Sequence, residues 1–202
     1  MAGQPGHLYF GPAWSPDDEW LVYLDCHSEE DPAHLSADLC IGRPDGSEHR
    51  VVTSGQSHWF GAAYGPAEAR GGGSNTSQWS PDGATITYTR IAPGSHPDCE
   101  YHPERPDHEE LVYRPDLARG GTQLCTLDPF SRRVTELTEF QEHRWDCRPT
   151  WSLDGRQIVF TRAVVGQPSE VWIMEGDGTN QCFLTRGYGN RGADHPRWLC
   201  IE

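Results

Sequence analysis

The segment Ser77-Gln78-Trp79-Ser80-Pro81-Asp82-Gly83 places a tryptophan directly before a tight turn, and the chain repeats this arrangement. The pattern also occurs as Gly11-Pro12-Ala13-Trp14-Ser15-Pro16-Asp17-Asp18 and as Arg148-Pro149-Thr150-Trp151-Ser152-Leu153-Asp154-Gly155. Its first half returns near the end as His195-Pro196-Arg197-Trp198. Self-similarity of this kind is typical of folds that stack one supersecondary unit several times. The motif therefore predicts three sheet units and the start of a fourth.

The sequence of each unit predicts four short strands. Alternating and β-branched runs bounded by Asp-Gly turns are hairpin signals, and no segment keeps a helical period. We therefore predict an all-β fold, a β-propeller of four-stranded antiparallel blades with about three complete blades plus one strand of a fourth. The expected strands are 10–14, 20–24, 38–41 and 49–52, then 85–88, 123–126 and 134–138, then 157–161, 171–174 and 182–185, and finally 194–200.

The blades are expected at about 7–54, 74–138 and 146–187, with the next beginning in 194–202, inside one domain of 202 residues. In an up-and-down blade, the connector between strands two and three and the connector to the next blade lie on one shared face. Here those connectors are long, at 27–37, 55–73, 92–118 and 139–146. Long loops on a rigid scaffold are where binding residues concentrate. We therefore expect the binding surface on the face that these long connectors form.

The bulk composition excludes several classes of function. The net charge of −14 argues against nucleic acid, because phosphate binding requires clustered cations. No stretch has the length of a membrane span, and the first residues contain no apolar signal core. These features predict a soluble protein, with a cytoplasmic location slightly favoured. Seven cysteines without a CxxC pair do not suggest a disulfide framework.

The chain resembles the TolB-like, WD40-like propeller repeats, whose signature is this Pro-x-Trp-Ser-Pro-Asp-Gly segment followed by an apolar strand. More narrowly it is similar to propeller-type polysaccharide lyases, the oligogalacturonate and ulvan lyase group. That similarity lies in 6–11 (Gly-His-Leu-Tyr-Phe-Gly), 59–62 (Trp-Phe-Gly-Ala) and 194–198 (Asp-His-Pro-Arg-Trp). It implies a carbohydrate-active propeller with an acidic polysaccharide or oligosaccharide as its partner.

Three units and one strand do not close a ring, since propellers have about four to eight blades. An open ring would expose apolar blade faces, which soluble monomers rarely tolerate. Three explanations stay open: missing blades from a longer protein, association with another copy as a homo-oligomer, or a stable open arc.

Residues before each motif tryptophan begin the innermost strands and line the funnel. β-Elimination on a uronic-acid polymer needs a cation for the sugar carboxylate, a base and an acid. Arg148 or Arg191 suits the first role, His195 or His58 the second, and Tyr188 or Tyr64 the third. Further residues expected to bind substrate are His7, Trp59, Asn75, Arg144, Trp145 and Asp146, with Trp59 and Trp145 as platforms for a sugar ring.

A group of candidate metal ligands lies inside the 92–118 connector. His96, Cys99, His102 and His108 provide four ligands that could hold Zn²⁺ or another divalent metal. A metal would also explain how so long a loop stays ordered. The competing interpretation is that a polar, proline-rich loop holds these histidines without a ligand.

A purely structural role is the alternative interpretation for the other candidate residues as well. Aspartate and arginine at strand starts often bond to neighbouring blades. Cys40 and Cys125 share the strand-three position of Trp172, and the motif tryptophans belong to the core, so all of these are expected to be packing residues. The alternative function is a non-catalytic propeller that serves as a protein- or ligand-binding scaffold. A further alternative is a chain that lacks the activity of longer relatives because its ring is not closed.

Overall fold

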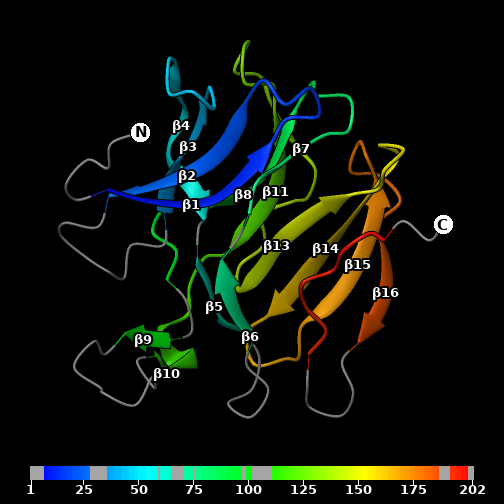
Figure 1. Cartoon of the computed structure of the whole chain (residues 1–202). Helices are drawn as coiled ribbons and strands as arrows, with labels where there is room; N and C mark the ends of the chain where they lie inside the picture. The colour runs from blue at the N-terminus through cyan, green and yellow to red at the C-terminus, as the bar shows by residue number, and fades with distance from the viewer. Residues whose placement is uncertain are drawn as a thin grey trace.

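The computed structural model describes residues 7–27, 36–58, 60–64, 71–74, 76–96, 99–101, 111–186 and 192–199 (Figure 1). Strands dominate these ranges, and the one helical element among them is the short 3-10 turn η1 (Pro115–Leu117). The all-β prediction is therefore confirmed. Within the same ranges, no helix is long and apolar enough to cross a membrane.

Three antiparallel units of four strands follow one another along the chain. In each unit the strands pair in chain order, and single ladder contacts from β4 to β8 and from β11 to β13 join the units into one 12-stranded sheet. The strands are β1 (His7–Trp14), β2 (Leu21–His27), β3 (Ser36–Gly42) and β4 (His49–His58), then β7 (Gln78–Trp79), β8 (Ile86–Ile91), β11 (Thr122–Leu127) and β12 (Val134–Glu136), then β13 (Arg144–Trp151), β14 (Gln157–Val164), β15 (Glu170–Glu175) and β16 (Cys182–Arg186).

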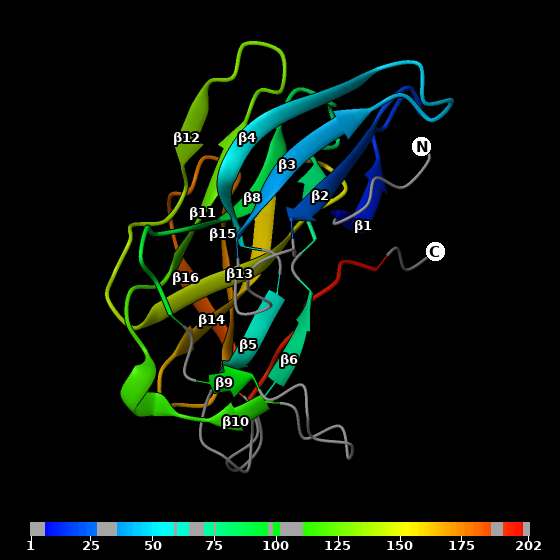
Figure 2. The same cartoon turned by 90° about the vertical axis from the view of Figure 1, so that its left-hand side faces the viewer.

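The connectors contain two small hairpins that the sequence did not predict. One pairs β5 (Phe60–Tyr64) with β6 (Gly71–Ser74), and the other pairs β9 (Cys99–Tyr101) with β10 (Leu111–Tyr113). Both hairpins lie at the lower end of the molecule in Figures 1 and 2, whereas the turn from β11 to β12 lies at the upper end. These connectors are thus gathered at the end away from that tight turn.

The motif turns are built from the same bonds in every unit. In the second unit the Ser80 hydroxyl donates to Asp82 Oδ1 at 2.5 Å and accepts the backbone N–H of Thr85 at 3.0 Å. The Ser80 hydroxyl is the main reason that the pKa of the Asp82 carboxyl is lowered. Side chains of this type favour turns because they bond to nearby backbone groups. The same bonds connect Ser15, Asp17 and Trp20 and connect Ser152, Asp154 and Gln157.

Each unit packs against the unit before it. A Cβ added to Gly83 would meet Pro16 Cδ at 3.7 Å, and one added to Gly155 would meet Pro81 Cδ at the same distance. Trp79 is buried with Val22 and other residues of the first unit. The inner strands β1, β7 and β13 are in contact in that order. The units therefore follow a common axis, as a propeller requires.

The motif tryptophans are not all core residues, which corrects the sequence prediction. Trp79 is 7 % exposed, and Trp151 donates from Nε1 to Thr87 Oγ1 of the preceding unit at 2.7 Å. Trp14, in the first of the described units, is 54 % exposed, and Trp198 is 37 % exposed. Burial of the tryptophan thus depends on the neighbouring unit and not on the motif alone.

The predicted innermost strand at 194–200 is also corrected. The described residues 192–199 form no strand, and none of the described strands pairs with them in a ladder. Hydrogen bonds to the third unit hold the segment in place: among them, Ala193 N donates to Ser169 O at 2.8 Å, and Trp198 Nε1 donates to Thr150 O at 3.2 Å.

The matched tryptophans give a test of this stacking. Trp79→Ala is expected to lower the free energy of unfolding by about 3–5 kcal/mol, because a large buried side chain leaves a cavity. Trp14→Ala makes the same chemical change in the same motif and should cost much less, because Trp14 is mostly exposed. Urea unfolding of both variants measures the difference. Equal losses would contradict the stacking of the units.

Candidate functional site

The inner end of the third unit holds a cluster centred on the Asp194 carboxylate. Arg148 Nη1 donates to Oδ2, and the Thr161 hydroxyl donates to Oδ1 at 2.7 Å. His195 lies beside the same group, with Nδ1 3.3 Å from Oδ2. Arg148 is 2 % exposed, whereas the His195 side chain is 48 % exposed. A buried arginine and an accessible histidine therefore share one carboxylate.

An unusual backbone brings this cluster together. Gly11, Arg148 and His195 precede the proline of their motifs, and all three have φ between 54° and 56°. In β1 and β13 this position coincides with a shift in the strand register, as expected of a β-bulge. Positive φ costs a non-glycine residue conformational energy, and such residues gather at functional sites. The bulge in β13 contains Arg148, and His195, which lies outside any strand, has the same positive φ.

The surroundings of His195 favour the neutral form of its imidazole. Partial burial lowers the pKa of its imidazole, and the nearby Arg148 guanidinium lowers it further, against the raising effect of Asp194. A carboxylate only accepts hydrogen bonds, so the 3.3 Å contact of Nδ1 with Asp194 favours the tautomer that carries the ring proton on Nδ1. Nε2 then carries the lone pair. The arrangement can therefore accept a proton at neutral pH.

A second carboxylate, that of Asp146 in β13, is fully committed to a buried ion pair. Asp146 is 0 % exposed and receives two hydrogen bonds from Arg162, from Nε at 2.7 Å and from Nη2 at 2.8 Å. Arg144 Nε lies 3.7 Å from the same carboxylate. Bidentate pairs of this type are strong and directional. The geometry gives Asp146 a role in fixing β13 against β14.

The first unit carries a related pair at the start of β1. His7 Nδ1 lies 2.9 Å from Oδ1 of the buried Asp25, and its ring stacks on Tyr9 with centroids 6.2 Å apart. In strand register, Tyr9 faces Asp25 just as Asp146 faces Arg162 in the third unit. His7 and His195 thus lie at the two ends of the row of inner strands.

The structure describes only some of the other residues that the sequence predicts for the site. Trp145 is 1 % exposed and packs with Cys147 and Ala163, because β13 begins at Arg144, inside the expected connector. Its ring has no face open to a sugar. For His58 and Tyr64 only the backbone is described, in β4 and β5. The remaining predictions, on Trp59, Asn75, Tyr188 and Arg191, lie outside the described residues.

The predicted metal ligands are only partly described. His96 is half-buried and forms a two-way backbone bridge with Arg119, at 2.9 and 3.0 Å. Cys99 is described only as backbone in β9, and His102 and His108 lie outside the described residues. No group of three or more His, Cys, Asp or Glu side chains in the described ranges is placed to hold a metal.

Cys40 and Cys125 are packing residues, as predicted. Cys40 and Cys125 are fully buried, and burial raises the pKa of their thiols to about 12 and about 11. Cys40 pairs with Tyr23 in the ladder, and Cys125 with Tyr88, at the position where Trp172 pairs with Phe160. The five cysteines whose side chains are described are all free.

Consecutive four-stranded antiparallel units that stack about a common axis define a TolB-like β-propeller fold. Solved structures of this kind match almost the whole chain. A putative TolB from Agrobacterium tumefaciens is similar over 96 % of this chain and 54 % of its own, with 18 % identity and a TM-score of 0.57. The oligogalacturonate lyase of Vibrio parahaemolyticus is similar over 90 % of this chain and 41 % of its own, with 12 % identity and a TM-score of 0.55.

A prolyl endopeptidase is also similar, over 93 % of this chain and 23 % of its own, with 14 % identity and a TM-score of 0.59. The chain thus spans about half the length of the TolB and less of the two enzymes. No family model matches the sequence. No curated protein matches it either. At these identities the likeness defines the fold and leaves the reaction to the residues of the site.

Several contributors to the site were not assigned a role from sequence. The sequence indicates only that Asp194 precedes a motif tryptophan and so lines the funnel, and it predicts no role for Thr161 or Asp25. Thr161 is 33 positions from Asp194, so no local pattern connects them. The adjacent pair Asp194-His195 was the one available signal, because a carboxylate beside a histidine orients the ring.

Proposed function

We propose that the chain belongs to a carbohydrate-active β-propeller whose axial face cleaves a uronic-acid polymer by β-elimination. The observation that carries the proposal is the cluster of His195, Asp194 and Arg148, which presents a neutral, accessible imidazole at the inner strands. The fold likeness to an oligogalacturonate lyase is consistent with this reaction.

In the proposed reaction, Nε2 of His195 takes the proton from the carbon next to the sugar carboxylate. The electron pair of that C–H bond forms a carbon–carbon double bond, and the bond to the leaving glycosidic oxygen breaks. That oxygen takes a proton from an acid, for which Tyr188 remains the proposed residue. The products are an unsaturated uronate and a shortened polymer. His58 remains the alternative base.

Arg148 has a different role from the one expected from sequence. Its guanidinium is buried and bound to Asp194, so it does not reach a substrate carboxylate in this arrangement. It acts as a positioning residue that fixes Asp194 and keeps the imidazole of His195 unprotonated. Neutralising the sugar carboxylate then falls to Arg191, which the proposal retains together with His7 and Arg144 as substrate-binding residues.

The experiment incubates the purified chain with polygalacturonate and, separately, with ulvan. Elimination creates a conjugated unsaturated uronate, so ultraviolet absorbance should rise, and mass spectrometry should detect products with the matching unsaturation. A rise that His195→Gln removes supports the proposal. If absorbance stays flat with every uronate polymer tested, the elimination proposal fails.

The competing function is a binding scaffold without catalysis. It is favoured by the commitment of Asp146 and Arg148 to buried ion pairs, which is what a purely structural inner surface would contain. It predicts retention of the chain on an immobilised partner without any change in that partner. Native mass spectrometry adds the copy number and any bound metal in the same preparation.

A further inference from the structure

A large cavity lies away from the inner strands, between the first and second units. Its volume is about 760 Å³, which falls in the range typical of small-molecule sites. Its polar lining comes from the middle and outer strands and from two connectors. The lining side chains used below are Gln56, Arg90, Pro93, Arg119, Gln123, Phe140 and Glu142.

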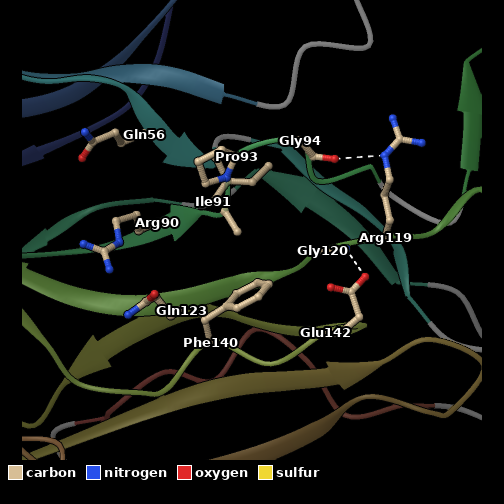
Figure 3. Close-up of a pocket in the computed structure, with 11 residues that line it drawn as sticks. Gln56, Arg90, Ile91, Pro93, Gly94, Arg119, Gly120, Gln123, Phe140 and Glu142 are labelled. Atoms are coloured by element: carbon tan, nitrogen blue, oxygen red, sulfur yellow. Dashed lines mark hydrogen bonds between the residues drawn. The ribbon is translucent and has the colours of Figure 1, made fainter.

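The cavity has apolar walls and two polar ends. In Figure 3 the ring of Phe140 faces Ile91 and Pro93 across the space, with Gln56, Arg90 and Gln123 at one end and Arg119 and Glu142 at the other. Gln123 lies directly opposite Arg90 in the ladder between β8 and β11, so the two side chains share a face of the sheet. Phe140 is 40 % exposed although its ring is apolar.

The two ends are fixed by bonds to the surrounding structure. Arg119 Nε donates to Gly94 O at 3.0 Å, and in the described part of the chain this is the one hydrogen bond of its guanidinium. Glu142 Oε1 accepts the backbone N–H of Gly120 at 2.6 Å. Gln123 Nε2 donates to Thr138 O at 3.2 Å. The polar groups are therefore positioned before any ligand arrives.

The charge of the lining favours an acidic ligand. The lining contains two guanidinium groups, those of Arg90 and Arg119, and one carboxylate, that of Glu142. Its positive balance contrasts with the net charge of −14 of the chain as a whole. Arg90 also pairs with Glu136, which lies outside the cavity lining and is 60 % exposed. Exposed ion pairs are weak, whereas an arginine inside a pocket binds a carboxylate strongly. A ligand carboxylate can therefore replace Glu136 at Arg90.

Hydroxyl groups and a flat apolar ring surface are the other features that the cavity suits. Guanidinium and amide N–H groups donate, and the Glu142 carboxylate and amide oxygens accept, as paired hydroxyls require. The Phe140 ring offers a face for packing between them. We propose that this pocket is a second, off-axis binding site for a short acidic oligosaccharide, with its carboxylate at Arg90 and a sugar ring against Phe140.

Calorimetric titration with digalacturonate tests the proposal, and the methyl ester of the same sugar removes the negative charge while adding only a methyl group at each carboxylate. We expect digalacturonate to bind, and both the methyl ester and Arg90→Met to weaken binding about tenfold or more. Glu136→Gln removes the competing carboxylate and should tighten binding. Because Glu136 is exposed, this variant keeps the test valid if Arg90→Met fails to fold.

Matched controls separate the pocket from general effects. Arg156→Met changes an arginine that is 82 % exposed in a turn and should leave affinity unchanged. Phe140→Ala should weaken binding, while Phe130→Ala, another exposed ring outside the cavity, should not. No binding, equal binding of the methyl ester, or an unchanged affinity in both Arg90→Met and Glu136→Gln would overturn the proposal. His195→Gln should bind digalacturonate in this pocket with unchanged affinity. The pocket can therefore be tested independently of the proposed elimination reaction.

Discussion

Asp146→Ala is expected to lower the free energy of unfolding by about 3–5 kcal/mol, because it leaves the buried charge of Arg162 without its partner. The carboxylate is 0 % exposed and receives both hydrogen bonds of the Arg162 fork. Arg162 also stacks on Trp172, with its Cζ 4.5 Å from the ring centroid, so it has little freedom to turn toward water. Urea unfolding followed by circular dichroism measures the loss.

Two further variants distinguish an unpaired charge from loss of a side chain in general. Asp154→Ala removes an exposed aspartate of a motif turn and should cost far less. The double variant Asp146→Leu with Arg162→Met replaces the pair by apolar side chains, and it should recover much of the stability lost in Asp146→Ala. If the double variant is as unstable as the sum of its single changes, the ion pair does not explain the loss.

His195→Gln is expected to reduce the rate of uronate elimination by about 10²–10⁴-fold, the range that a general base contributes. The unfolding free energy should change little, because His195 is exposed at the edge of the third unit. The rate of absorbance increase with polygalacturonate measures the effect. A variant that keeps the full rate would remove His195 from the base role and favour His58.

The pH dependence of the same reaction supplies a sharper check. A base must be unprotonated, so the rate should rise with pH through the pKa of His195 and then level off. That pKa is lowered from 6.5, chiefly by burial and then by Arg148, so the rising limb should lie below that pH. Arg148→Met should move the limb to higher pH. Asp194→Asn should move it to lower pH, since Asp194 raises this pKa.

The sequence predicted those features that depend on short-range bonds. Ser80, Asp82 and Thr85 make their turn with partners two and five residues away, so the repeated motif contains all the information required. The strand pattern follows from the same turns, and all three units have the predicted order. The strand expected at 194–200 was wrong because a strand depends on a partner, which the motif does not supply.

The site was less predictable because its contacts join distant segments. Arg148 suits a substrate carboxylate by residue type, but Asp194, 46 positions away, binds it inside the protein. The expected connector at 139–146 gave Trp145 an exposed position, whereas the strand starts at Arg144 and turns that ring inward. The off-axis pocket combines residues from 56 to 142 and has no sequence signature.

The most direct test of the axial cluster is the pKa of His195, measured by NMR titration of the histidine ring protons. The spectrum of His195→Gln assigns the resonance among the ten histidines. We predict a value below 6.5 in the native chain and a clear increase in Arg148→Met. A value at or above 6.5 that Arg148→Met leaves unchanged would show that Arg148 does not lower the pKa of His195.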